Sequence, residues 1–126
     1  DLSFLKAKID AGADYIVTQM FFDNAKYFDF VKLCRENGIN VPIIPGLKPL
    51  TTSKQLSILP KIFHVDIPHD LIEMVEQCKN EKEVKQAGIE WCIQQSKELM
   101  AAGVPCLHYY TMGNAEITCR IAEKVF

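Results

Sequence analysis

The chain has 126 residues, of which 48% are hydrophobic and 24% charged, as in an ordinary globular domain with one core. Its formal net charge of -2 gives no positive field for nucleic acid or anionic lipid, and its apolar runs are far shorter than the roughly 20 residues of a membrane helix. We therefore expect one domain over residues 1–126 that binds neither nucleic acid nor membrane.

A helix-to-strand pattern opens the chain and recurs twice. The stretch 2–11 is amphipathic, Gly12 can end it in the left-handed conformation, and the β-branched and aromatic run 15–19 follows as a strand. The second copy predicts a helix over 25–37 and a strand over 41–45. This alternation is typical of parallel βα units, whose strands are buried on both faces.

A longer stretch between the second and third strands must hold extra helices. Pro60 should bend or end the first of them, and Pro68 suits the first position of the next. The last helix of the chain should bury Ile117, Ile121 and Val125. The remaining predicted elements are helices over 52–63, 68–79 and 81–102, a strand over 106–110 and a closing helix from about residue 114.

Three parallel strands cannot close a barrel, which needs eight, and they would leave both edges of the sheet open. We therefore predict an α/β fold made of parallel βα units that form the C-terminal portion of a (β/α)8 TIM barrel. The chain begins with Asp1 rather than methionine and shows no secretory leader, so we expect it to be cut from a longer protein.

The cysteines and histidines suggest no metal site. The five cysteines are odd in number and form no C-x-x-C pair, which argues against a disulfide framework or structural zinc and favours a reducing cytoplasm. All five are expected on buried apolar faces. The histidines lack the spacing of metal ligands, and His108, inside an apolar strand, is expected to be a core residue.

Polar residues follow the ends of the predicted strands, where the active sites of α/β barrels lie. The amide of Gln19 could read a ring edge with alternating donors and acceptors, or simply bond its own loop backbone. The run 20–22 that follows is more typical of core than of a ligand floor. Pro45 with Gly46, and Lys48 with Pro49, predict a rigid turn whose glycine lets a ligand approach the backbone, although most Pro-Gly pairs are merely turns.

Several motifs resemble the methylenetetrahydrofolate reductase family in the same order. They are LKAK at 5–8, AGA at 11–13, VTQMFFD at 17–23, PIIPG at 42–46 and LHYYT at 107–111. The resemblance covers nearly the whole chain. It implies a (β/α)8 barrel that binds FAD, takes electrons from NAD(P)H and reduces 5,10-methylenetetrahydrofolate to 5-methyltetrahydrofolate.

The resemblance also implies roles for individual residues. Gln19 and Gln55 correspond to family glutamines that contact folate, and Tyr110 to a tyrosine of the substrate pocket. Asp1 and Lys8 correspond to flavin ligands, which would bind ribityl or ribose hydroxyls and the diphosphate. Alone, Asp1 would be read as a helix N-cap and Lys8 as a solvated lysine.

Two departures from the family pattern affect the expected function. Asn114 stands where the family usually has a basic residue that engages the folate side. The general-acid glutamate and the aspartate beside the flavin belong to barrel strands that this chain does not contain. We therefore expect no turnover by the chain alone, a requirement for the remainder of the barrel, and a homo-oligomer when the protein is complete.

Two alternatives remain open from the sequence. One is a non-catalytic α/β half-barrel that self-associates through its open edges as a binding or structural module. The other is a different flavin barrel, such as a proline dehydrogenase relative, which fits the architecture but not the block at 17–23.

Overall fold

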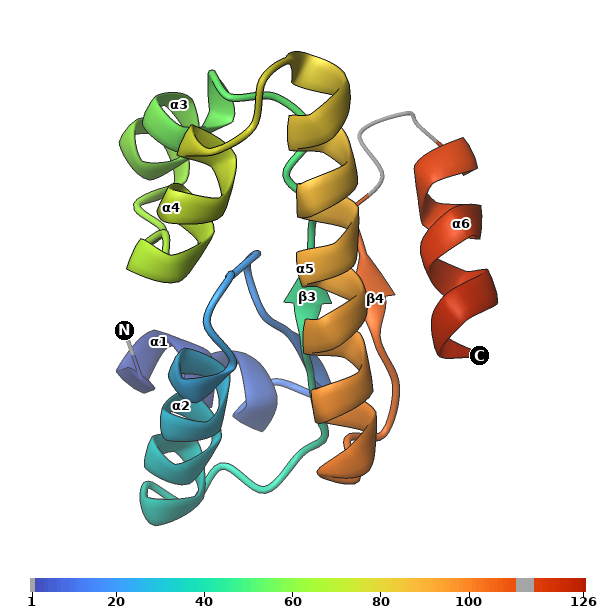
Figure 1. Cartoon of the computed structure of the whole chain (residues 1–126). Helices are drawn as coiled ribbons and strands as arrows, with labels where there is room; N and C mark the ends of the chain where they lie inside the picture. The colour runs from blue at the N-terminus through green and yellow to red at the C-terminus, as the bar shows by residue number, and fades with distance from the viewer. Residues whose placement is uncertain (1, 111–114) are drawn as a thin grey trace.

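The computed structural model describes residues 2–110 and 115–126, and the predicted alternation of helices with parallel strands is confirmed there (Figure 1). Within these ranges the elements are α1 (Leu2–Asp10), β1 (Ile16–Val17), α2 (Asn24–Glu36), β2 (Ile43–Ile44), β3 (Gly46–Leu47), α3 (Gln55–Phe63), α4 (His69–Glu76), α5 (Glu81–Ala101), β4 (His108–Tyr109) and α6 (Ala115–Val125).

The helix ends show why these segments are helical. Asp23 accepts a hydrogen bond from the Ala25 amide at 3.0 Å and caps α2, and Asn80 accepts from the Glu83 amide at 2.9 Å and caps α5. Gly12, after α1, has the predicted positive φ of 118°. Most other residues would be strained in this conformation, so glycine permits the reversal into β1.

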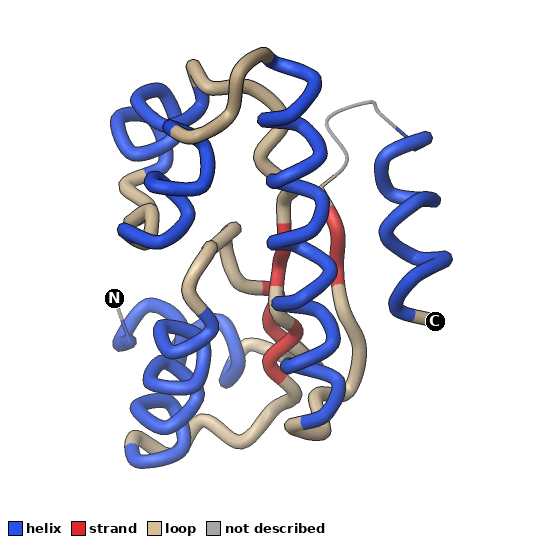
Figure 2. Tube along the Cα trace, viewed as in Figure 1, coloured by secondary structure: helices blue, strands red, loops and turns tan. Residues whose placement is uncertain are grey.

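The strands form a short parallel layer at the centre of the chain (Figure 2). β1 pairs with β2, with Ile16 opposite Ile43, and β3 pairs with β4, with Gly46 opposite His108. β2 lies within the predicted second strand (41–45), and β3 lies beyond its predicted end, on the other side of Pro45. The chain pairs with β1 before Pro45 and with β4 after it, so three strand positions lie side by side.

One face of this layer is covered by helices (Figure 1). Leu47 on β3 and Ile43 on β2 are buried with Cys92 and Leu99 of α5, and Ile121 of α6 completes the same cluster. α6 and α4 both pack against α5, as the contacts between these helices show. The predicted apolar face of the last helix is confirmed at Ile117 and Ile121, which are buried.

A second cluster lies where α3 and α4 meet the strand ends. It contains Met20 and Phe22, which confirms that this run is largely core, together with Leu50, Leu59 and Leu71. α5 approaches this region closely at Gly88, where an added Cβ would lie 1.6 Å from the Leu50 carbonyl oxygen. Only a residue without a side chain allows this contact.

The other face of the strand layer is more exposed. Val17 of β1 and Tyr15 before it are 37% and 58% exposed. His108 is also exposed, so its prediction as a core residue was wrong; its ring packs edge-on against Tyr110, with centroids 4.7 Å apart. Apolar neighbours in sequence could not reveal that this face of β4 is left exposed by the described residues.

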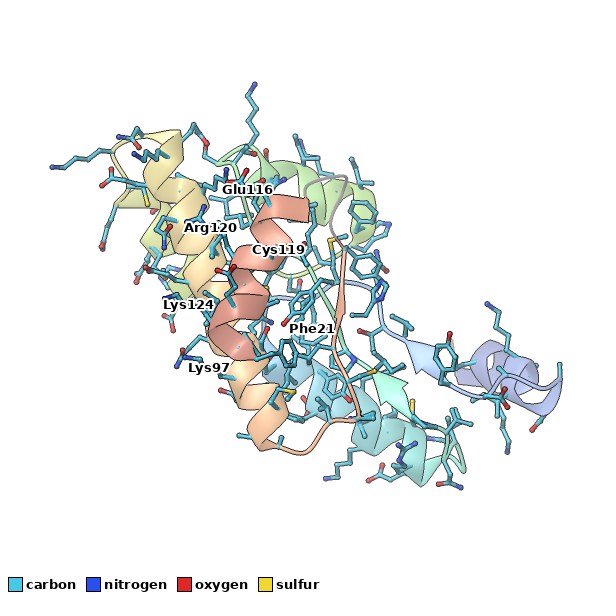
Figure 3. All side chains as sticks on the ribbon, turned by 90° about the vertical axis from the view of Figure 1, so that its right-hand side faces the viewer. Phe21, Lys97, Glu116, Cys119, Arg120 and Lys124 are labelled. Carbon is cyan, nitrogen blue, oxygen red and sulfur yellow. The ribbon has the colours of Figure 1, made fainter. Side chains whose placement is uncertain are left out.

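Two of the cysteine predictions were also wrong. Cys34 and Cys92 are buried as expected, but Cys106 and Cys119 are exposed. Cys106 lies in the loop before β4, and Cys119 lies on the outward side of α6 with Glu116 and Arg120 (Figure 3). Among the described residues no group of three or more His, Cys, Asp or Glu side chains could hold a metal ion.

Pro60 does not end its helix, and Pro68 lies one position before the first helical residue of the next helix. Pro60 lies inside α3, which continues to Phe63 and ends at His64 in the left-handed conformation. Pro68 is the N-cap of α4 rather than its first helical residue. Pro45 and Gly46 belong to the strand region instead of a turn.

In the described parts of the chain, no helix has the length and apolar character needed to span a membrane.

Candidate functional site

Tyr110 ties the ends of the three strand positions together. Its hydroxyl donates to the Thr18 carbonyl at 2.7 Å, and the Gly46 amide donates to the Thr18 hydroxyl oxygen at 2.9 Å. A Cβ on Gly46 would lie 2.6 Å from Cε2 of Tyr110 and 2.4 Å from the Thr18 carbonyl oxygen. The missing side chain of Gly46 therefore lets the phenol lie across β3 and reach the end of β1.

Two of the residues predicted to bind substrate, Gln55 and Tyr110, line one cavity of about 650 Å³, which we call the strand-end cavity. It lies between the strand ends, the loop before α3 and the first turns of α5 and α6. Its lining consists of Lys48, Pro49, Thr51, Thr52, Lys54, Gln55, Ile58, Leu59, Lys85, Tyr110, Ile117 and Thr118.

Gln55 is held in place by the loop that precedes α3. Its Oε1 accepts hydrogen bonds from the amides of Thr51 at 2.7 Å and Thr52 at 3.4 Å. These bonds fix the carboxamide at the start of the helix and occupy its acceptor. The amide nitrogen is the part of Gln55 that remains to donate to a ligand.

Gln19 lies in a different hollow. Its Nε2 donates to the Phe63 carbonyl at 3.0 Å, across to the end of α3 and not to its own loop. The hollow has a volume of about 230 Å³ and is also lined by Phe21 and His64. The structure thus distributes the three predicted folate ligands over two hollows, and their common role in substrate binding stays a prediction.

α5 fixes the loop that carries Gln19. The indole nitrogen of Trp91 donates to the Phe22 carbonyl at 2.8 Å, and Nε2 of Gln95 donates to the Phe21 carbonyl at 3.3 Å. Nδ2 of Asn24 donates back to the Gln95 carbonyl at 3.2 Å. Nothing in the sequence pairs these distant residues. Together their hydrogen bonds hold the loop against the helix and so help to fix the position of Gln19.

Lys48 is a cavity residue that sequence reasoning placed only in a turn. It is 5% exposed, and its Nζ donates to the Pro49 carbonyl at 3.3 Å. Burial lowers the pKa of its ammonium, and the nearby Cys92 partly opposes that effect. The alternation of side chains along a strand was the available signal for this position. Lys48 follows Gly46 by two residues, so both lie on the same face of the strand.

Of the two residues predicted to bind flavin, Lys8 lies within the described part of the chain and Asp1 does not. Lys8 is exposed in the last turn of α1. Asp1 lies outside the described residues, as does Asn114, the position where the sequence departs from the family pattern. Their predicted roles therefore stay predictions.

The same fold occurs in a solved structure of an uncharacterised protein from Clostridium thermocellum, described as binding two copies of 5-methyl-5,6,7,8-tetrahydrofolic acid. The superposition has a TM-score of 0.65 and covers 98% of this chain and 46% of that one, at 23% sequence identity. At this identity the likeness shows the fold alone, an α/β arrangement of parallel strands and helices.

The family follows from the sequence comparison. Residues 1–125 match the methylenetetrahydrofolate reductase family model, and this chain belongs to that family. It is 41% identical to methylenetetrahydrofolate reductase (NADH) 1 of Arabidopsis thaliana, over 89% of this chain and 19% of the relative. It is 37% identical to 5,10-methylenetetrahydrofolate reductase of Pectobacterium carotovorum, over 99% and 42%. The chain thus spans less than half the length of these relatives.

Proposed function

We propose that this chain is the C-terminal part of the (β/α)8 barrel of a cytoplasmic FAD-dependent reductase. That enzyme uses NAD(P)H to reduce 5,10-methylenetetrahydrofolate to 5-methyltetrahydrofolate, within one-carbon metabolism and methionine biosynthesis. The family match over residues 1–125 carries the proposal. The relatives are named for both NADH and NADPH, so the nicotinamide donor is left as NAD(P)H.

The one-sided covering of the strands supports a barrel. Helices α5 and α6 bury one face, whereas Val17 and His108 leave the opposite face exposed. In a closed barrel that opposite face is filled by side chains of the other strands. The remaining barrel strands are thus the partner that this face requires.

In the proposed enzyme this chain binds and orients the folate. The amide of Gln55 donates to the ligand from a carboxamide already fixed by Thr51, and Tyr110 forms the adjacent wall. Gln19 supplies its acceptor oxygen from the neighbouring hollow, since its nitrogen is bonded to Phe63. Lys8 and Asp1 would hold FAD, which supplies the hydride chemistry when bound.

Turnover requires groups from outside this chain. The general-acid glutamate that the family uses is expected on the barrel strands that precede these residues. We therefore assign binding, rather than proton transfer, to Gln19, Gln55 and Tyr110, and we expect the complete enzyme to form a homo-oligomer. The 126 residues alone should show no reductase activity.

The test uses the complete reductase that carries this chain. It should purify with a flavin absorption spectrum that bleaches with NAD(P)H and recovers with methylenetetrahydrofolate. Gln55→Ala should lower kcat/KM for the folate by about 10²-fold, as expected for a lost ligand contact in a closed site. Gln94→Ala, exposed on α5, is the control and should not change it.

A colourless protein that stays colourless with added FAD would refute this function. A stable dimer of the 126 residues that binds neither flavin nor folate would instead support the alternative, a self-associating half-barrel. Sedimentation and absorbance on the same sample separate these outcomes.

A further inference from the structure

Lys48 is a charged side chain almost completely removed from water. It is 5% exposed, yet the Pro49 carbonyl at 3.3 Å is the acceptor that its ammonium contacts. An ammonium carries three N–H donors, so two of them have no acceptor among the described residues. A buried ammonium without a counter-charge is costly, and proteins that keep one pair it or use it.

The described residues that line the cavity around Lys48 add positive charge and no carboxylate. Lys54 and Lys85 also line the strand-end cavity, together with Thr51 and Thr118. Among the described residues that line this cavity, none is Asp or Glu. Glu81 does not line the cavity: its carboxylate accepts from the amide and hydroxyl of Ser53, and it also interacts with the positive charge of Lys54.

The strand-end cavity combines this charge with groups that could contact a flat polar ligand. Gln55 and Tyr110 form one part of the wall, where a flat polar ligand could be read by an amide donor and a phenol ring. The three lysines line the same cavity of about 650 Å³, which is large enough for a ligand with a planar body and an acidic end.

We propose that Lys48 anchors a carboxylate of the ligand in the strand-end cavity, with Lys54 and Lys85 forming an outer cationic rim. This inference rests on the proposed function, in which the acidic group is the glutamyl end of the folate. The two spare N–H donors of Lys48 bind the carboxylate directly, and the rim attracts any further glutamyl carboxylates. Burial lowers the pKa of the Lys48 ammonium, and a bound carboxylate would raise it again.

The experiment compares two ligands in the complete reductase. One is 5-methyltetrahydrofolate and the other is the primary amide of 5-methyltetrahydropteroate, which has the same ring system but carries no carboxylate. Lys48→Met keeps an unbranched side chain as far as Cε and removes the ammonium. It should weaken binding of the folate about tenfold or more, the effect of losing a charge-assisted hydrogen bond, and change binding of the pteroate amide less than about twofold.

Two controls protect this result. Lys97→Met removes an exposed lysine of α5 (Figure 3) and should leave both dissociation constants unchanged. The double variant Lys54→Met/Lys85→Met tests the rim. It should weaken binding of a polyglutamylated folate more than binding of the monoglutamate, and that difference should shrink at high salt.

The outcomes distinguish the two proposals. If wild-type protein binds neither ligand, the proposed function fails. If it binds both and Lys48→Met weakens both equally or neither, folate binding stands and the anchoring role of Lys48 is wrong. If Lys48→Met does not fold, the rim variant Lys54→Met/Lys85→Met decides. If that variant loses no more affinity for the polyglutamylated folate than for the monoglutamate, the anion site is wrong.

Discussion

Tyr109 and Tyr110 are consecutive in sequence and belong to opposite sides of the strand layer. The Tyr109 hydroxyl lies 2.8 Å from Ser96 Oγ, under α5, and burial raises the pKa of this phenol. The Tyr110 hydroxyl reaches the Thr18 carbonyl, beside the strand-end cavity. One side is fixed by dense packing within the chain, whereas the other is shaped by gaps that a ligand or another strand can fill.

The tightest contact of the covered side predicts the largest effect. Gly88→Ala would place a Cβ 1.6 Å from the Leu50 carbonyl oxygen, which is backbone and cannot rotate away. We expect a loss of more than about 4 kcal/mol in the free energy of unfolding, measured by urea titration.

The control for this prediction lies on the outer side of the same helix. At an uncrowded helix position, replacing glycine with alanine should raise the free energy of unfolding by about 1 kcal/mol. At Gly88 the contact with Leu50 should instead make the same replacement destabilising. Lys97→Ala, at an exposed position of α5, should change stability by less than about 0.5 kcal/mol. A Gly88→Ala variant more stable than wild type would show that α5 does not approach Leu50 this closely.

A buried thiol on the covered side gives a prediction that depends on pH. Burial raises the pKa of Cys92 from 9.0 to about 12. Since the folded pKa is the higher one, stability is fully present below pH 9 and is lost as pH rises toward 12. The loss attributable to this group should reach on the order of 4 kcal/mol at the upper end.

Two variants isolate this thiol from the other groups that titrate above pH 9. Cys92→Ala should flatten the fall in stability between pH 9 and pH 12, whatever it costs at neutral pH. Cys119→Ala, at an exposed position of α6, should leave the fall unchanged. Equal slopes for wild type and Cys92→Ala would contradict a thiol held neutral by the core.

The covered side was largely predictable from sequence, and the open side was not. Helical spacing placed Ile117 and Ile121 in the core because burial imposes a periodic pattern. His108 has apolar neighbours too, but its exposure depends on which elements cover β4. The separation of Gln19 from Gln55 depends on where α3 lies, and no local pattern encodes that position.

A smaller effect is expected at the junction of the two sides. Gly46→Ala would crowd both Cε2 of Tyr110 and the Thr18 carbonyl, at a cost of about 1–3 kcal/mol. In the double variant Gly46→Ala/Tyr110→Ala the ring contact is gone, so the two losses should not add. Strict additivity in urea titrations would mean that Gly46 is not required by Tyr110.

The smallest expected effect returns to the tyrosine pair and separates their roles. Tyr109→Phe and Tyr110→Phe each remove one hydrogen bond, and each should cost about 1 kcal/mol of stability. Only Tyr110→Phe should also weaken binding of 5-methyltetrahydrofolate by the complete reductase, because without its bond to Thr18 the ring is no longer held at the cavity wall. Because the two variants should lose similar amounts of stability, a difference in ligand affinity between them reflects which face of the strand each tyrosine occupies. It does not reflect general damage to the fold. Equal affinities for the two variants would mean that the strand-end cavity does not use Tyr110.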